Sequence, residues 1–146
     1  MRLIDGMKVL LMVATVLLAG LCSSASAQEC LNYWPAVVTL TGTLRAQVFP
    51  GPPNYESIRR GDRRERAIIL TLASRTCMTG KESDDLDVPE SNIREMQLVV
   101  TKSAHWKTVE RRLGKRVTVT GTLFHGFNGH HRTKVFVTVT NIRAAA

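Results

Sequence analysis

The chain has 146 residues, and its 20 Lys and Arg against 12 Asp and Glu give a formal charge of +8. This length favours one domain, and 44% apolar with 22% charged residues exclude a wholly disordered or collagen-like chain. Aromatic residues make up only 5%, which argues against the large stacking surface of single-stranded nucleic-acid readers.

Residues 1–27 have the features of a secretory signal peptide. Arg2 and Lys8 precede an apolar run, and residues 25–27 form an A-x-A cleavage site. The run is short for a membrane span, which needs ~20 apolar residues, although a retained N-terminal anchor stays an alternative. We therefore predict an exported protein, periplasmic or extracellular, with no membrane span after cleavage.

Two features of this segment are open. Met7 is a second possible start, because Lys8 and the apolar run would still form a short signal. Cys22 suggests lipidation, but Leu21 stands where the residue before a lipidated cysteine is normally small.

Cleavage after Ala27 would remove two cations and one anion, leaving 119 of the 146 residues with a charge of +7. It would also leave Cys30 and Cys77 as a pair of cysteines. In an oxidising compartment such a pair favours a disulfide, which we predict in preference to redox chemistry. Two cysteines so far apart do not form a zinc knuckle.

A near-repeat is the strongest pattern in the remaining chain, residues 28–146. Val38–Leu44 and Val117–Leu123 are identical at six of seven positions, and both alternate apolar residues with Thr. This alternation predicts strands with one buried face. Each copy carries a Gly on that face, which indicates a sharp bend or a close backbone approach. We expect two equivalent strands of one curved sheet.

Three more strands and one helix complete the prediction. Residues 67–73, 96–100 and 135–139 have the apolar patterns of strands. The helix is expected over 104–113, with Ser103 as its N-cap. The order β-β-β-α-β-β with bent, Gly-containing strands predicts a mainly β domain, a small five-stranded OB-like barrel with the helix between strands 3 and 4.

Histidines surround the turn between the last two strands. A three-residue loop over 127–129 pairs Leu123 with Thr133 and keeps apolar residues on the buried face, whereas a two-residue loop does not. This register places His125 directly opposite His131 on the interior face, with His130 on the other. The two opposed imidazoles are a candidate transition-metal site or pH sensor, and the alternative is that they only close the barrel.

The connection Phe49–Glu65 is the second candidate site, because it begins with prolines and then carries a dense arginine cluster. In an OB barrel this connection and the last hairpin flank the usual ligand face. Arginines beside aromatic residues suit phosphates, carboxylates or nucleic acid, and export argues against nucleic acid. The alternative is a solvated loop that aids solubility. The predicted ligand-binding residues are Tyr55, Arg59, Arg60, Arg63, Arg64 and His130.

The leading functional hypothesis is a binding module that recognises an anionic envelope ligand or partner protein through loop 49–66 and the hairpin 124–132. The alternatives are a metal- or pH-responsive site at His125 and His131, and a small hydrolase. Nucleophile-elbow and phosphate-loop motifs are absent from the sequence, so we predict no catalytic residues and no cofactor beyond the possible metal. The sequence contains no pattern that indicates the oligomeric state.

Several blocks of the sequence resemble a known family. They are FPGPPNYESI, Gly61-Asp62, Cys77, LGKRVTVTGTLF and GHHRTKV. Together, over roughly residues 30–143, they are similar to exported bacterial domains of unknown function, catalogued as domain-of-unknown-function family four-four-three-one. The resemblance implies a small β-rich domain and brings no activity. Members often carry a third His in the hairpin, where this chain has Arg132, and that departure argues against a His-cluster metal site.

Overall fold

The computed structural model describes residues 29–81 and 86–146. The predicted signal peptide, with Met7 and Cys22, lies outside these residues. The described part is mainly β, with five strands and one α-helix. The strands are β1 (Val37–Pro50), β2 (Arg64–Met78), β3 (Glu90–Val99), β4 (Arg116–His125) and β5 (Val135–Ala144). The helix is α2 (Ser103–Arg112), and a 3-10 turn η1 (Ile58–Arg60) lies between β1 and β2.

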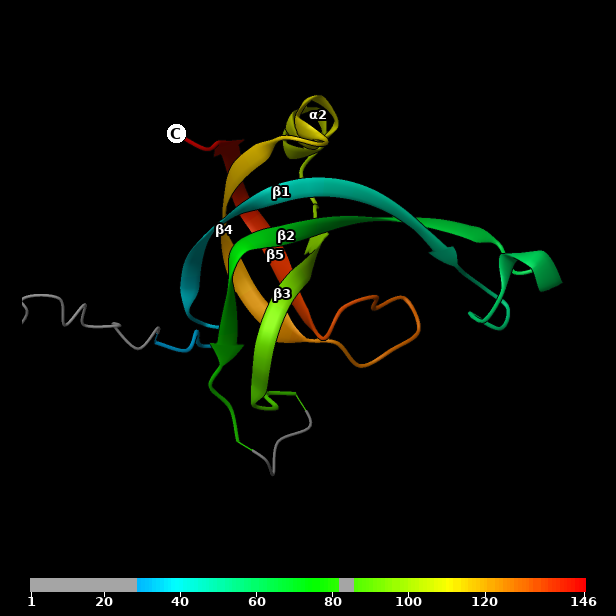
Figure 1. Cartoon of the computed structure of the whole chain (residues 1–146), viewed down its shortest axis with the longest axis horizontal. Helices are drawn as coiled ribbons and strands as arrows, with labels where there is room; N and C mark the ends of the chain where they lie inside the picture. Colours follow the sequence, from blue (N-terminus) through cyan, green and yellow to red (C-terminus); the bar gives the residue numbers. More distant parts are fainter. Residues whose placement is uncertain (1–28, 82–85) are drawn as a thin grey trace, which may run out of the picture.

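The five strands form one sheet whose pairings close into a ring in the order β1-β2-β3-β5-β4 (Figure 1). The order in the sheet differs from the chain order because β5 lies between β3 and β4. The pairing of β3 with β5 is parallel, and the other four pairings are antiparallel. The predicted helix between strands 3 and 4 is confirmed. Along the chain, the order of elements differs from the prediction only by the additional 3-10 turn η1.

The two copies of the near-repeat lie side by side. They belong to β1 and β4, where Val38 pairs with Gly121 and Gly42 with Val117. A Cβ on Gly42 would lie 2.4 Å from the carbonyl oxygen of Thr71, and one on Gly121 would lie 2.2 Å from that of Thr138. The predicted close backbone approach is confirmed at both glycines, since any side chain would push the neighbouring strand away.

The interior of the ring is apolar. Leu44, Val119, Leu123 and Val137 are fully buried. Leu44 and Leu123 alternate with more exposed neighbours, as predicted for strands with one buried face, whereas in β5 Phe136 beside Val137 is also fully buried. Burial of each such side chain stabilises the fold by about 2 kcal/mol.

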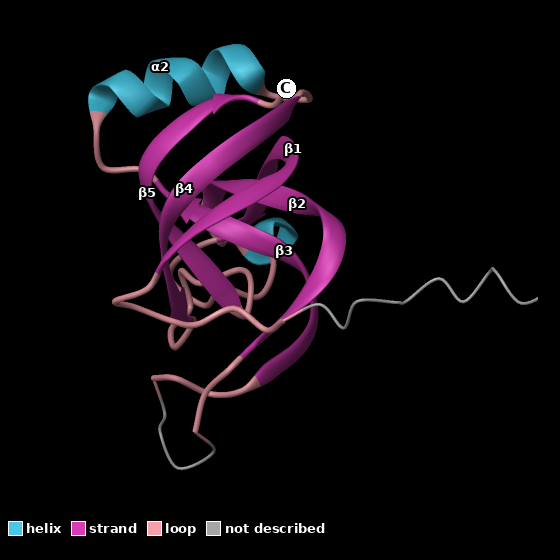
Figure 2. Ribbon diagram, turned by 90° about the vertical axis from the view of Figure 1, so that its left-hand side faces the viewer, coloured by secondary structure: helices cyan, strands magenta, loops and turns pink. Residues whose placement is uncertain are grey.

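Helix α2 covers one end of the sheet and inserts Val109 into the core (Figure 2). Ser103 is not its N-cap, because the cap position falls on Lys102 and makes no side-chain hydrogen bond. At the other end Gly114 has a φ of 75° and donates its N–H to the carbonyl of Leu44 at 2.8 Å. The end of the helix is therefore joined to β1.

The disulfide Cys30–Cys77 is present in the structure. It joins the segment before β1 to the end of β2, where Leu31 also forms a bridge to Met78. Within the described residues, no helix has the length and apolar character that crossing a membrane requires.

Candidate functional site: two connections on one side of the sheet

Strands β1 and β2 extend further than the sequence predicted. Phe49 pairs with Glu65 and Pro50 with Arg64, so the connection between them is 51–63 and not 49–65. Pro50 ends β1, as expected for a residue without an N–H. The two strands carry this connection to the same side of the molecule as the connection 126–134 between β4 and β5 (Figure 1).

Asp62 fixes the backbone of the connection 51–63. Its side chain accepts hydrogen bonds from the backbone N–H groups of Asn54, Glu56 and Ser57 at 3.0, 2.8 and 2.7 Å. Gly61 has a φ of 104°, a left-handed conformation that turns the chain and brings Asp62 inward. These hydrogen bonds, first among them the one from Ser57, hold the pKa of Asp62 below its usual range. The carboxylate is therefore an ionised anchor for the loop.

His131 has the same role in the connection 126–134. Its Nδ1 accepts hydrogen bonds from the backbone N–H groups of Phe127 and Asn128 at 2.8 and 3.3 Å. Its ring lies 4.1 Å from that of Phe136, centroid to centroid. Burial, followed by the charges of the neighbouring histidines His130 and His125, lowers the pKa of His131. The neutral imidazole is the form that can accept both hydrogen bonds.

The two connections touch. The Tyr55 hydroxyl lies 2.9 Å from Nε2 of His130, and Nδ1 of His130 lies 3.2 Å from Glu65. Arg132 forms an ion pair with Glu65 at 2.6 Å, and its guanidinium lies 5.4 Å from the ring centroids of both Phe49 and Tyr55. From the OB topology we predicted that the two connections flank one face. The contacts of Tyr55 with His130 and Arg132 show that the two connections lie next to each other.

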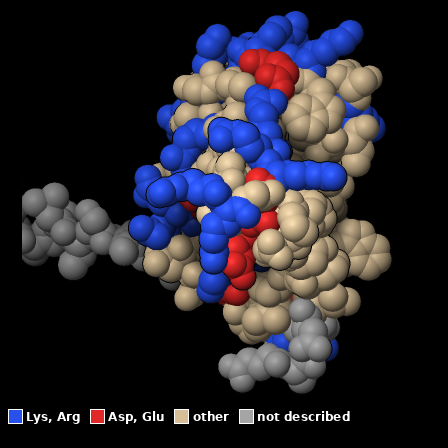
Figure 3. Space-filling view, turned by 90° about the vertical axis from the view of Figure 1, so that its right-hand side faces the viewer, with Lys and Arg blue, Asp and Glu red and all other residues tan. Residues whose placement is uncertain are grey.

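Positive charge covers this side of the molecule. Figure 3 shows Lys and Arg side chains spread over it around a few acidic side chains. Arg60 forms an ion pair with Glu56 at 2.9 Å, but both are largely exposed. Arg59, Arg63 and Arg64 are exposed, and among the described residues none of the three has an ion pair or a side-chain hydrogen bond. Three exposed cations therefore have no ion-pair partner among the residues that the structure describes.

A pocket of about 680 Å³ opens beside the connection 126–134. At one wall Glu90 accepts a hydrogen bond from Lys134 at 2.8 Å and lies 3.2 Å from Nε2 of His125. Burial acts to raise the pKa of Glu90, but the hydrogen bonds from Lys134 and His125 outweigh it and lower that pKa. The exposed ring of Phe127 forms an apolar part of the wall. The lining residues are Glu90, His125, Gly126, Phe127, Asn128, His131, Arg132, Thr133 and Lys134.

The predicted register of β4 and β5 is wrong. His125 pairs with Val135 and Leu123 with Val137, so His131 lies in the connection and not opposite His125. The observed register is shifted by an even number of residues, which leaves the same side chains on the buried face and replaces the predicted partner Thr133 by Val137. The longer loop lets His131 accept backbone hydrogen bonds.

Both histidines still line the same pocket, but they do not form the predicted cross-strand pair. In the described part of the chain, no group of three or more His, Cys, Asp and Glu side chains is arranged to hold a metal ion. Nδ1 of His125 is buried and has no hydrogen-bond partner in residues 29–81 and 86–146. The metal hypothesis therefore stays a prediction, and the described residues offer no third ligand arranged beside the two histidines.

Four residues of this region were missed from the sequence. Asp62 accepts hydrogen bonds from three backbone N–H groups that precede it by five to eight residues, an arrangement for which one sequence contains no signal. Glu65 and Arg132 form an ion pair between segments far apart in the chain, for which one sequence contains no signal. Glu90 is the first residue of β3, outside every strand predicted from the sequence, and it contacts His125 and Lys134 at the pocket wall.

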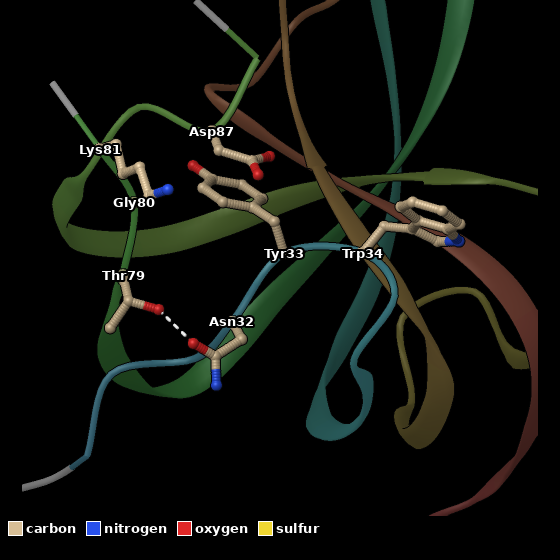
Figure 4. A pocket seen from close by; sticks show the side chains of 7 residues that line it. All are labelled: Asn32, Tyr33, Trp34, Thr79, Gly80, Lys81 and Asp87. Atoms are coloured by element: carbon tan, nitrogen blue, oxygen red, sulfur yellow. Dashed lines mark hydrogen bonds between the residues drawn. The ribbon is translucent and has the colours of Figure 1, made fainter. Parts of the chain in front are cut away.

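A separate pocket of about 360 Å³ lies at the other end of β2 (Figure 4). Tyr33 donates its hydroxyl hydrogen to the carbonyl of Val88 at 2.8 Å. Burial, followed by the charges of Glu90 and Asp87, raises the pKa of Tyr33 to about 12. Trp34 is 70% exposed, and its ring points away from that of Tyr33. Tyr33 has a structural role here, as a buried and satisfied hydrogen-bond donor.

Residues 95–143 match the model of a family described as a domain of unknown function, DUF4431. The predicted resemblance is confirmed over this range, which includes α2, β4 and all but the last residue of β5. The blocks before residue 95 remain a resemblance only. No curated protein matches the chain.

Proposed function

We propose that the protein is an exported binding module with an OB-like barrel, and that the two connections 51–63 and 126–134 bind an anionic ligand or partner of the cell envelope. The observation that carries this proposal is a set of three arginines without an ion pair among the described residues: Arg59 and Arg63 on a loop that Asp62 holds in place, and Arg64 directly after it at the start of β2.

Arginines that form no ion pair with the described residues are free to bind an anion. A guanidinium that already pairs with a carboxylate must break that contact before it binds a ligand, whereas these three have no such contact within the described residues. Guanidinium groups also bind phosphate and carboxylate oxygens in a bidentate manner. The site is therefore suited to phosphate, sulfate or carboxylate groups.

Preorganisation of the loop adds to this affinity. Ordering a flexible loop on binding costs ~1 kcal/mol or more for each residue fixed. Asp62 and the contacts of Tyr55 with the second connection already order the backbone, so that cost falls on folding and not on binding. Tyr55 lies in the same connection as Arg59 and Arg63, and its hydroxyl contacts the imidazole of His130, so both groups could form further hydrogen bonds with a ligand.

Two other observations support the finer parts of the proposal. The closed sheet order β1-β2-β3-β5-β4, with a helix between β3 and β4, is compatible with an OB barrel. The disulfide Cys30–Cys77 is compatible with an oxidising compartment outside the cytoplasm, where such bonds persist.

The test is binding of the purified protein to immobilised heparin, used as a general anionic polymer, over a series of salt concentrations. We expect the variant R59Q/R63Q/R64Q to bind at least about tenfold more weakly than the wild type at low salt, with a smaller dependence on salt. A matched control, R94Q/K102Q/K107Q, removes the same number of exposed cations elsewhere and should retain most of the affinity. Equal losses in both variants would refute a localised site.

A further inference from the structure

We propose a second anion-binding site, for a diphosphate or a similar multiply charged phosphate group, in a pocket at the C-terminal end of α2. The pocket has a volume of about 620 Å³, which is within the range of small-molecule sites. Four of its six lining residues are cations: it is lined by Thr108, Arg111, Arg112, Lys115, Arg143 and Ala144.

Three separate elements hold these cations in position. Arg111 and Arg112 are in the last turn of α2, Lys115 is in the turn that follows, and Arg143 is near the end of β5. The turn is tied to β1 by hydrogen bonds in both directions, from Gly114 N–H to the carbonyl of Leu44 and from Leu44 N–H to the carbonyl of Lys115. The pocket is therefore built on the closed sheet and its helix.

No acidic side chain neutralises the pocket in the described part of the chain. Glu110 is the only acidic residue of α2, and Arg66 of β2 takes both of its carboxylate oxygens, at 2.7 and 3.2 Å. That hydrogen bonding lowers the pKa of Glu110, which stays ionised and bound to Arg66. The four cations form none of the described ion pairs.

A helix C-terminus favours cations, but it does not account for four of them. The helix dipole places about half a negative charge at this end, which Arg111 and Arg112 already exceed. Lys115 and Arg143 lie outside the helix and add to the excess. Like charges so close together repel one another, and a bound anion with several oxygens would relieve that repulsion.

This site is distinct from the one between the connections 51–63 and 126–134, and the two can be tested separately. The probe is inorganic pyrophosphate, added to the isotopically labelled protein while amide chemical shifts are followed. We expect saturable shifts at the amides of Thr108, Lys115 and Arg143. In the variant R111Q/K115Q/R143Q the affinity at these amides should fall at least about tenfold, whereas R59Q/R63Q/R64Q should leave it unchanged.

The variants leave the half-buried Arg112 in place to limit effects on folding, and thermal unfolding checks that they remain folded. A second variant, R111K/R143K, retains the charge and should keep binding measurable if the protein is folded. Pyrophosphate shifts that are absent from this pocket, or that persist unchanged in R111Q/K115Q/R143Q, would overturn the proposal. Binding to phosphatidylglycerol vesicles without binding to pyrophosphate would also overturn it, because the site would then recognise a membrane surface.

Discussion

The connections 51–63 and 126–134 use the same device with different chemistry. In each, one side chain accepts hydrogen bonds from consecutive or nearly consecutive backbone N–H groups and so holds an irregular segment in one conformation. In the first the acceptor is the carboxylate of Asp62, and in the second it is the imidazole of His131. A carboxylate accepts hydrogen bonds over almost the whole pH range, whereas an imidazole nitrogen stops accepting when it is protonated.

The two connections should therefore differ in their tolerance to acid. The pKa of Asp62 is lowered from an ordinary value of 3.8, and that of His131 from 6.5. The arginine-bearing connection should therefore keep its conformation under mildly acidic conditions. The histidine-bearing connection should lose its anchor first.

The largest expected effect comes from D62A. Three backbone N–H groups would lose their acceptor, and we expect their amide hydrogen exchange to become faster by on the order of a hundredfold. Heparin binding should weaken in parallel because the arginines would no longer be held in place. The matched control is E56A, which removes a carboxylate from the same loop but an exposed one. Similar exchange rates in the two variants would contradict the role of Asp62.

The next effect is that of H131A, which removes both an acceptor and a ring packed against aromatic side chains. We expect a loss of about 2 kcal/mol in the free energy of unfolding, measured with urea. H131F keeps the ring and should lose only about half as much. A variant H131F as damaging as H131A would show that the hydrogen bonds, and not the packing, account for nearly all of the stabilisation.

A smaller effect is expected from pH itself. Because the pKa of His131 is lower in the folded protein than its ordinary 6.5, its stabilising contribution is complete above pH 6.5 and declines as the pH falls through the lowered value. Hydrogen exchange at Phe127 and Asn128, corrected for intrinsic rates, should show this decline, while Glu56 and Ser57 stay protected until the pH falls below 3.8. Loss of protection in both connections at the same pH would refute the difference between them.

The smallest effect is expected for Y55F, which removes the hydroxyl that contacts His130. The contact is partly exposed, so a loss of at most about 1 kcal/mol is expected from thermal unfolding. If Y55F destabilised the protein as much as H131A, the contact between the two connections would be more important than the anchors within them.

Much of the sheet could be predicted from the sequence because strand periodicity reports directly on burial. Alternation in Val38–Leu44 and Val117–Leu123 identified the faces of β1 and β4, and their glycines identified the close approach to neighbouring strands. The family resemblance also held for residues 95–143. These features depend on local patterns, which one sequence contains.

The register of the last hairpin and the contacts of the site could not be obtained in this way. Alternation distinguishes odd from even shifts, but a shift of four residues keeps every side chain on its face, so it could not separate Thr133 from Val137 as the partner of Leu123. Likewise the ion pair of Glu65 with Arg132 joins residues that only the closed sheet brings together.

The proposed binding surface can be tested in one titration. Amide chemical shifts of the labelled protein are followed while a short heparin-derived oligosaccharide is added at low salt. We predict saturable shifts in the connections 51–63 and 126–134, including Arg59, Arg63 and His130, and their loss in R59Q/R63Q/R64Q. Shifts that avoid both connections, or shifts in the two connections that persist in this variant, would contradict the proposed function.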